Sequence, residues 1–243
     1  MKILSIGNEC SSDIQTYLPF LAKAAGKELL LGNLRLDNAN IENHYRNYID
    51  EEEVYVYETY LPGETDAMKP DGIALHEAVE DDDWDIITLQ QEHSLAGDIE
   101  SFRPYLSELT AYCKLMHPEA KTALNQMWAY ESGCGIPDFR NNFNNNQQEM
   151  YESLAGVCNE IAEEAEIDLQ IPLARAFQIA RSTNLGDRFT TDGKHLNELG
   201  QFLASCVLYE AVFGESALNS PFDLPEYDKA ISDLIKICAD TAF

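Results

Sequence analysis

Short apolar runs alternate with longer amphipathic stretches along almost the whole chain. Five of the apolar runs have the length of strands, and they read KILSIG, ELLLGNL, DIITL, AKTALNQMW and DLQIP. The stretches between them repeat apolar residues every three or four positions, which is the period of a helix. Strands that alternate with helices over short connections favour a mainly parallel sheet with helices on both faces. The pattern therefore predicts an α/β fold. Because no Pro-, Gly- or Ser-rich linker divides the sequence, we expect residues 1–243 to form a single domain.

The remaining elements follow from the same pattern. Helices are expected over residues 11–26, 38–49, 72–80, 101–116, 145–165, 173–182, 196–213 and 225–243. The run EVYVYETY alternates with period two and predicts an edge or hairpin strand. The segment GCGIPDFRNNFNNNQQ is the longest irregular stretch, and we expect it to be a loop beside the active site.

The balance of charge narrows the choice of partners. The chain has 43 Asp and Glu against 16 Lys and Arg, a formal net charge of -27. Such a field repels nucleic-acid phosphates and anionic membrane surfaces, so we expect neither as a partner. No apolar run approaches the roughly 20 residues that span a bilayer. A small neutral or cationic molecule is the expected ligand, although acidity can also serve solubility alone.

The cysteines and histidines give no sign of a disulfide framework or a metal site. The six cysteines are scattered without a Cys-X-X-Cys pair, and the N-terminus lacks the features of a signal peptide. We therefore expect a reducing, cytoplasmic setting, or a secreted one only if a leader has been removed. His44, His76, His93 and His117 share no ligand spacing with carboxylates, so no metal and no cofactor are expected.

The candidate chemistry lies just after the strands, where open α/β sheets bind ligands. The polar groups at these places are Gly7-Asn8-Glu9, Asp37 to Asn40, Gln90 to His93, Asn125 to Trp128 and Asp192 to His195. In the stretch DGKHL, Asp192 precedes His195 by three residues, at the start of a helix. This spacing lets the carboxylate hold one ring nitrogen while the other faces the cleft, as a general base requires. Alternatively, Asp192 caps the helix and His195 is a surface residue.

Together, ILSIGNECSSD near the start and DGKHL near the end resemble the SGNH, or GDSL-like, hydrolases. The likeness is to a bacterial branch whose members begin with Ile-Gly-Asn-Ser-Phe-Ser. The segments YLPFLAKAAG, WDIITLQQ, NQMWAYE and NLGDRFTTDGKHL are similar to the same branch, so the resemblance runs from residue 3 to about residue 214. It implies a flavodoxin-like, three-layer α/β/α fold with a Ser-His-Asp esterase site.

The resemblance also implies a role for each candidate residue. His195 and Asp192 match the general base and its orienting acid, whereas Glu9 stands where the nucleophilic Ser is expected. The oxyanion donors would be the backbone after the second strand, at Asp37 and Asn38, and a side-chain amide of Gln90 or Gln91. Trp128 could stack on a sugar ring, although a Trp after a strand is more often part of the core.

The Glu at the nucleophile position separates two functions. A carboxylate is a weak nucleophile, and its charge opposes the developing oxyanion. Cys10 could attack instead, but a shift of one residue turns it away from His195. Ser11 reads as a helix N-cap. Glu9 itself could act as a base, pair with His195 or cap the helix. We expect a pseudoenzyme that binds a small polar, carbohydrate-like ligand; the alternative is an esterase that uses His195 and Asp192 with altered nucleophile chemistry.

Overall fold

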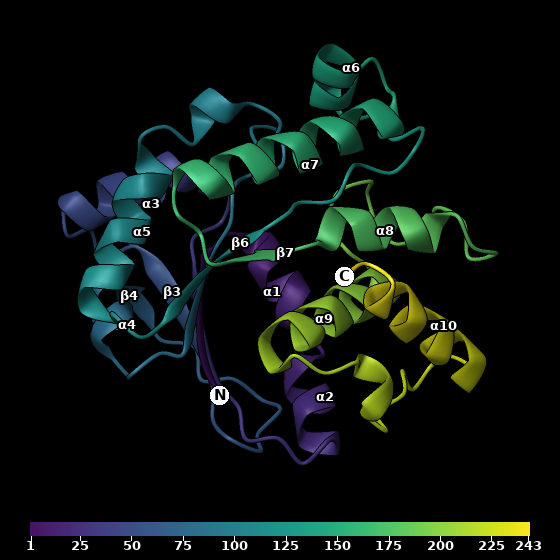
Figure 1. Cartoon of the computed structure of the whole chain (residues 1–243), viewed down its shortest axis with the longest axis horizontal. Coiled ribbons are helices and arrows are strands. Elements are labelled where there is room, and N and C mark those ends of the chain that lie inside the picture. Colours follow the sequence, from purple (N-terminus) through teal and green to yellow (C-terminus); the bar gives the residue numbers. More distant parts are fainter.

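A seven-stranded sheet runs through the middle of the protein, as a computed structural model of residues 1–243 shows (Figure 1). Its strands are β1 (Lys2–Gly7), β2 (Leu30–Arg35), β3 (Tyr55–Tyr60), β4 (Asp71–Ile73), β5 (Ile86–Leu89), β6 (Lys121–Asn125) and β7 (Leu169–Ile171). The strands lie in the order β4-β3-β2-β1-β5-β6-β7. The five neighbouring strands β2, β1, β5, β6 and β7 are parallel, which confirms the mainly parallel sheet. Their order is the flavodoxin-like one.

The other two strands form an antiparallel edge. β3 pairs with β2 and β4 pairs with β3, both antiparallel. The period-two run therefore forms a hairpin strand, as expected. The strand β4 was not predicted, because its three residues precede a helical pattern without a break. The helix that we expected over 72–80 begins at Leu75.

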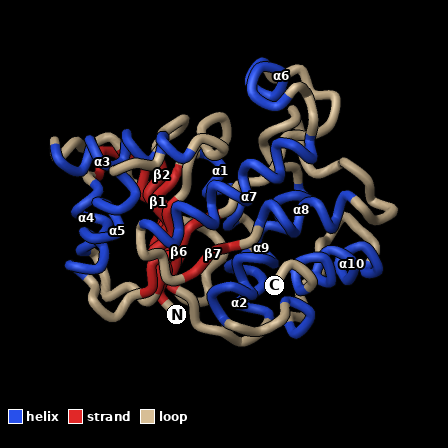
Figure 2. The backbone as a smooth tube through the Cα atoms, turned by 45° about the horizontal axis from the view of Figure 1, so that its top comes forward, coloured by secondary structure: helices blue, strands red, loops and turns tan.

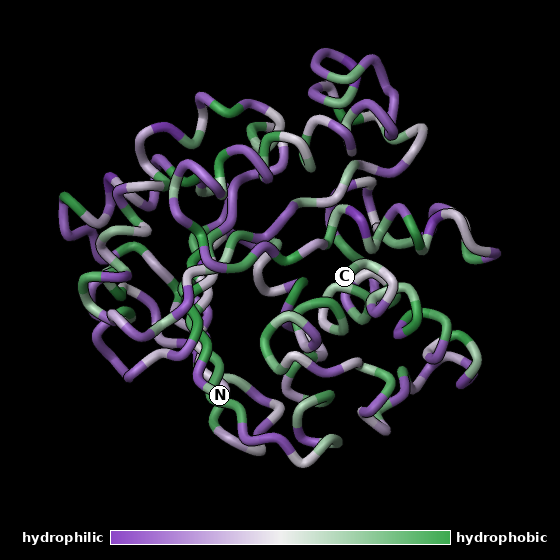
Figure 3. Tube along the Cα trace, in the orientation of Figure 1, coloured by the Kyte–Doolittle hydropathy of each residue, from purple (hydrophilic) through white to green (hydrophobic).

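Helices cover both faces of the sheet (Figures 1 and 2). One face carries α1 (Glu9–Gln15), α2 (Leu18–Ala24), α8 (Leu173–Arg181), α9 (Glu198–Phe213) and α10 (Lys229–Asp240), and the other carries α3 (Ile41–Ile49), α4 (Leu75–Glu80) and α5 (Tyr105–Met116). Alternate strand residues serve the two sides: Ile3 belongs to a core of 41 buried residues beneath α9, and Leu4 to one of 22 beneath α5. Figure 3 shows hydrophobic positions concentrated along these central strands.

The helix α7 (Gln147–Glu164) lies beyond β7 and joins the two cores. Met150 and Leu154 pack into the larger core, whereas Cys158 and Ile161 pack into the smaller one. The short helix α6 (Pro137–Phe143) precedes it, at the end of the molecule where the parallel strands finish (Figure 1). We expected this segment to be irregular, because its run of Asn residues hides a helix of only seven residues.

The first predicted helix is wrong in two respects. It begins at Glu9 instead of Ser11, because the side chain of Asn8 accepts a hydrogen bond from the Cys10 N–H and so caps the helix. It is also divided in two, since Pro19 has no N–H to continue the helix and sits in the first turn of α2. Both α1 and α2 pack against α9. No helix has the length and apolarity that crossing a bilayer requires.

Candidate functional site

Three segments that are far apart in the sequence meet at the carboxyl ends of β1 and β5. α1 starts with Glu9, two positions after the end of β1, and Glu92 is the third residue after β5. The turn from Asp192 to His195 precedes α9, and its Lys194 contacts both Glu9 and Glu92. β1 and β5 are neighbours in the sheet, and from them the strand order proceeds to β2 on one side and to β6 and β7 on the other. In such sheets, ligands bind at the point where the strand order reverses in this way.

The carboxylate of Glu9 lies at the centre of this site. One oxygen, Oε2, accepts a hydrogen bond from the Asn38 N–H at 2.7 Å. The other, Oε1, lies 3.1 Å from the Lys194 ammonium and 3.5 Å from His195 Nε2. Only 18% of the side chain is exposed. Glu9 and His195 therefore share one site.

Lys194 links the three segments, a role that the sequence pattern did not predict. Its Nζ lies 3.0 Å from Glu92 Oε1 as well as 3.1 Å from Glu9 Oε1, so one ammonium bridges two carboxylates. Glu92 is held in turn by Ser94, whose N–H donates to it at 2.7 Å. A Lys beside a His in a turn usually faces solvent, and only the fold brings this one inward.

The pair of Asp192 and His195 has the geometry that the sequence predicted. Asp192 Oδ2 lies 2.6 Å from His195 Nδ1, and Oδ1 accepts the backbone N–H groups of Lys194 and His195. The carboxylate thus orients the imidazole and shapes the turn. The ring is 41% exposed, so a ligand can approach it from solvent.

The contacts of Glu9 and Asp192 stabilise their charged forms. Burial alone would raise the pKa of Glu9, but hydrogen bonds from the N–H groups of Asn38 and Glu9, together with the charge of Lys194, lower that pKa to about 2. Burial opposes ionisation of Asp192 as well, yet its hydrogen bonds from His195 and Lys194 lower its pKa to about 2. Both side chains are therefore carboxylates at neutral pH.

His195 and Lys194 hold their protons more firmly than usual. Burial lowers the pKa of His195, but the hydrogen bond and charge of Asp192 outweigh it and, with Glu9, raise the pKa above its ordinary value. Burial also lowers the pKa of Lys194, whereas the neighbouring Cys10, Glu92 and Glu9 raise it by more. The site is a cluster of carboxylates and protonated bases that neutralise one another in part.

The predicted oxyanion donors do not all face the site. Asn38 does, through its backbone N–H, in a left-handed conformation with a φ of 60°. The side chain of Gln90 is 1% exposed and donates to Asn8 Oδ1. Gln91 is equally buried, accepts the N–H groups of Ile41 and Glu92, and donates to Ser101. The expectation that Gln90 or Gln91 offers a free amide to a ligand is corrected: both are occupied inside the protein.

Trp128 also lies inside the protein, which agrees with the core role that is usual for a Trp after a strand and corrects the alternative, stacking on a sugar. Its side chain is fully buried, its indole N–H donates to the Lys194 carbonyl at 3.0 Å, and its ring stacks on Phe177. The chain turns inward after β6, so that Trp128 supports the turn carrying Lys194 and His195. Trp128 therefore supports the backbone of the site and is not accessible to a ligand.

A buried pair formed by Cys10 and His93 lies next to the site. Cys10 Sγ is 3.7 Å from His93 Nδ1, and both side chains are fully buried. Burial raises the pKa of the Cys10 thiol and lowers the pKa of His93 to about 3, so both are neutral. The Cys10 thiol is thus turned away from His195, as expected. Ser11 donates to Asn8 O and to Asn33 Oδ1 in the first turn of α1, and is not its cap.

The residues of the site do not form a metal centre. No group of three or more His, Cys, Asp or Glu side chains has an arrangement that could hold a metal ion. The cations that contact Glu9 instead are protein groups, Lys194 and His195.

The whole fold matches known structures. A crystal structure of a DUF4886 family protein from Bacteroides uniformis is 28% identical and has a TM-score of 0.96, covering 100% of this chain and 94% of that one. A candidate SGNH hydrolase from Slackia heliotrinireducens is 20% identical with a TM-score of 0.60, covering 87% and 98%. A catalytic mutant of an acetylxylan esterase from Geobacillus stearothermophilus is 13% identical with a TM-score of 0.55, covering 92% and 95%.

The last two likenesses show that the chain has the fold of SGNH hydrolases and esterases. No curated protein sequence matches the chain. The family model described as "Domain of unknown function (DUF4886)" matches residues 2–242, which is nearly the entire sequence. The chain therefore belongs to the DUF4886 family.

Proposed function

We propose that this protein binds a small, hydroxyl-rich ligand at a hydrolase-like site that has lost ester hydrolysis. One observation carries the proposal: the ionised Glu9 carboxylate already occupies the donors that an ester's oxyanion would need. The Asn38 N–H donates to it at 2.7 Å and Lys194 lies 3.1 Å from it. The net charge of -27 further supports a small molecule over nucleic acid or an anionic membrane surface as the partner.

A carboxylate at this place works against acyl transfer in two ways. It is a weak nucleophile, and attack on an ester would produce a mixed anhydride. Its charge also lies where negative charge must develop in the transition state, which raises the barrier. Loss of the nucleophile in a serine protease costs on the order of a millionfold in turnover, and we expect a similar loss for Glu9 in the position of the Ser.

The protonation of His195 supports the same conclusion. A general base must be neutral when it accepts a proton. Here the ring lies between two carboxylates, 2.6 Å from Asp192 and 3.5 Å from Glu9, and its pKa is raised. The imidazole is therefore protonated to a higher pH than usual, and it offers a ligand a donor more readily than a base.

The exposed groups of the site suit a ligand with several hydroxyls. Asp192 and His195 are the most accessible of them, with exposed side-chain fractions of 54% and 41%. A carboxylate accepts from hydroxyls and a protonated imidazole donates to them. The acetylxylan esterase among the fold neighbours acts, by its name, on a carbohydrate, which makes sugars the first class to test.

The alternative, an active esterase, has one observation in its favour. The Asp192 and His195 pair retains the 2.6 Å contact that orients a catalytic base. If a ligand drew Glu9 away, the imidazole could lose its proton and activate water. This version makes hydrolysis depend on His195 and on a pH above its raised pKa.

Two measurements on wild type and His195→Ala separate these functions. We expect wild type to hydrolyse p-nitrophenyl acetate no faster than His195→Ala, and to bind xylotriose in a calorimetric titration that His195→Ala weakens at least about fivefold. Turnover by wild type that His195→Ala abolishes would establish the esterase instead. Equal xylotriose binding by both proteins, or binding by neither, would contradict the proposed ligand site.

A further inference from the structure

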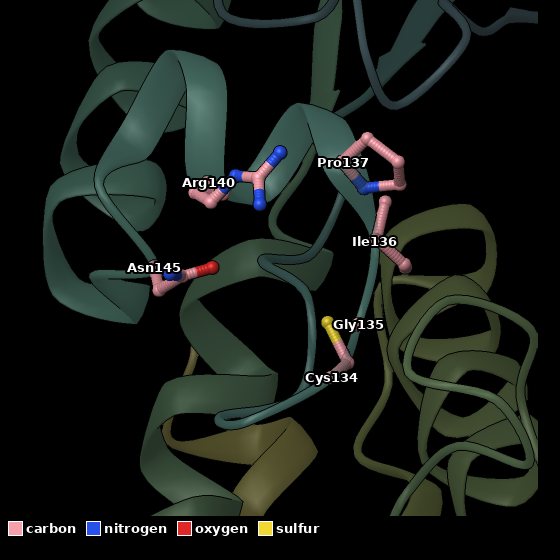
Figure 4. Close-up of a pocket in the computed structure, with 6 residues that line it drawn as sticks. All are labelled: Cys134, Gly135, Ile136, Pro137, Arg140 and Asn145. Atoms are coloured by element: carbon pink, nitrogen blue, oxygen red, sulfur yellow. The ribbon is translucent and has the colours of Figure 1, made fainter.

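A surface cavity lies beside the proposed ligand site, at the same end of the sheet. It has a volume of about 310 Å³ and is lined by Cys134, Gly135, Ile136, Pro137, Arg140 and Asn145. In Figure 4, the guanidinium of Arg140, the amide of Asn145 and the thiol of Cys134 converge on it from three sides. The cavity thus combines one cation, one amide and an apolar wall formed by Ile136 and Pro137.

Arg140 is the only cation that lines this cavity. It forms no ion pair within the protein, so its guanidinium is free to meet a ligand. It is exposed, and it projects from α6 over the cavity (Figure 4). A guanidinium presents paired N–H donors that match the two oxygens of a carboxylate. The Asn145 amide turns its oxygen toward the cavity in Figure 4 and can accept a hydrogen bond from a hydroxyl. The cavity therefore fits one carboxylate attached to a small polar body.

The backbone around the cavity is tied to the turn that carries His195. The Glu131 N–H donates to the Gly193 carbonyl at 2.9 Å. Cys134 packs so closely on Gly193 that a Cβ at Gly193 would overlap the Cβ of Cys134, and Gly193 has a φ of 96° that favours glycine. The wall of the cavity and the Asp192 to His195 turn are thus one packed unit.

We propose that this cavity binds the carboxylate of an acidic sugar, a hexuronate, whose hydroxyls reach the turn of Asp192 and His195. The inference rests on the proposed function and names the class of ligand for that site. The net charge of -27 disfavours a polyanion at long range. A hexuronate differs from a polyanion, because it carries a single carboxylate. That carboxylate would contact the unpaired Arg140 at short range, while the sugar hydroxyls would face the carboxylates of the site.

Cys134 provides a direct readout of occupancy. It is half-buried and lines the cavity, whereas the other five cysteines are buried. Iodoacetamide should therefore alkylate Cys134 first, and a ligand in the cavity should slow that reaction. The probes are D-glucuronate and D-glucose, which differ only in the carboxylate. Alkylation at Cys134 is followed by mass spectrometry of its peptide.

The variants are Arg140→Gln, Arg175→Gln and His195→Ala. Arg175 is an exposed Arg of α8 that also forms no ion pair and does not line the cavity, so it controls for the loss of one charge. We expect glucuronate to protect Cys134 in wild type and Arg175→Gln, with a dissociation constant about tenfold higher in Arg140→Gln. Equal protection of Arg140→Gln and wild type, or no protection of wild type, would overturn the proposal.

The same experiment distinguishes failure of this inference from failure of the proposed function. If glucose and glucuronate protect wild type equally, and His195→Ala weakens both, the sugar site stands and the role of Arg140 is wrong. If His195→Ala binds both sugars as wild type does, the proposed ligand site is wrong, and so is the inference that depends on it. A second result is expected from the alkylation of Cys134 without sugar. Iodoacetate carries a carboxylate that Arg140 attracts, whereas iodoacetamide carries none, so the ratio of their rates should fall in Arg140→Gln and stay unchanged in Arg175→Gln.

Discussion

At the scale of single residues, the site is governed by the neutralisation of charge. Glu9, Glu92 and Asp192 are carboxylates, and Lys194 and His195 lie within 2.6 to 3.5 Å of them. Half-buried charges of this kind are tolerated because each has a partner and further hydrogen bonds. In the proposed function, this arrangement closes the oxyanion position with a side chain of the protein itself.

The ionisation of His195 tests this view of the site. Because its pKa is raised by Asp192 first and by Glu9 to a lesser degree, we expect Asp192→Asn to lower that pKa more than Glu9→Gln does. The raised pKa also means that the pairing stabilises the fold below the unfolded value of about 6.5 and that this stabilisation is lost as pH rises through the folded pKa. NMR titration of the ring protons measures each pKa.

Glu226→Gln removes an exposed carboxylate near the C-terminus and is the matched control, which should leave the titration of His195 unchanged. The interpretation would be wrong if Glu9→Gln and Glu226→Gln gave the same pKa for His195. It would also be wrong if the pKa of His195 in wild type fell below 6.5.

Part of this residue-scale arrangement could be predicted from the sequence. The spacing of Asp192 and His195 predicted their contact, because three residues in a tight turn bring a carboxylate to a ring nitrogen. The resemblance placed Glu9 opposite them. The role of Lys194 could not be predicted, since it depends on where β1 and β5 deliver Glu9 and Glu92. The burial of Gln90, Gln91 and Trp128 likewise follows from the inward turn of the chain after β5 and β6.

At the scale of elements, the site depends on how closely the late turn packs on the segment after β6. Gly193 allows this contact, since it has a φ of 96° and no Cβ to collide with Cys134. Gly133 lies in the same segment with a φ of 80°, but nothing lies near the place of its Cβ. The two glycines therefore separate the cost of backbone strain from the cost of the collision.

We expect Gly193→Ala to destabilise the protein more than Gly133→Ala. Gly133→Ala should lower the free energy of unfolding by about 1 kcal/mol through strain alone. Gly193→Ala should lower it at least about twice as much, because the collision adds to the strain. Urea unfolding of both variants measures the difference. Equal losses would show that the turn can move away from Cys134 at no cost.

Most elements could be predicted because each long amphipathic stretch or apolar run points to one structure. The five parallel strands and the helix α9 are such cases. The exceptions are short or depend on distant contacts: β4 has three residues and gains its structure by pairing with β3, and α6 is a seven-residue helix in an Asn-rich stretch. The break between α1 and α2 was signalled by Pro19, but the apolar period ran through it.

At the scale of the whole molecule, the dominant feature is the net charge of -27. Mutual repulsion of so many carboxylates opposes the compact state, and salt weakens this repulsion by screening. The surface ion pairs act in the opposite sense, because salt weakens them too, but exposed pairs contribute little. Repulsion should therefore decide how stability changes with ionic strength.

We expect the melting temperature to rise by about 3 °C or more between 10 mM and 150 mM sodium chloride at pH 7.5. The Debye length falls from about 30 Å to about 8 Å over this range, and 3 °C corresponds to about 1 kcal/mol for a chain of this size. At pH 4.5, near the isoelectric point of about 4.3, the rise should largely vanish. A fall in melting temperature at pH 7.5 would mean that ion pairs outweigh repulsion.

The central claim of the proposed function is that Glu9 blocks hydrolysis at a site that keeps a base in His195, its orienting acid in Asp192 and an oxyanion donor in the Asn38 N–H. The most direct measurement is the turnover of p-nitrophenyl acetate by Glu9→Ser, compared with wild type and with Glu9→Ala. Because Ser is shorter than Glu, Glu9→Ser would vacate the place of the carboxylate, 3.5 Å from His195 Nε2, for an ester carbonyl and would free the Asn38 N–H to hold an oxyanion. We predict that Glu9→Ser gains at least about a hundredfold in turnover over both, and that His195→Ala in that background removes the gain. Turnover by wild type equal to or greater than that of Glu9→Ser would contradict the claim.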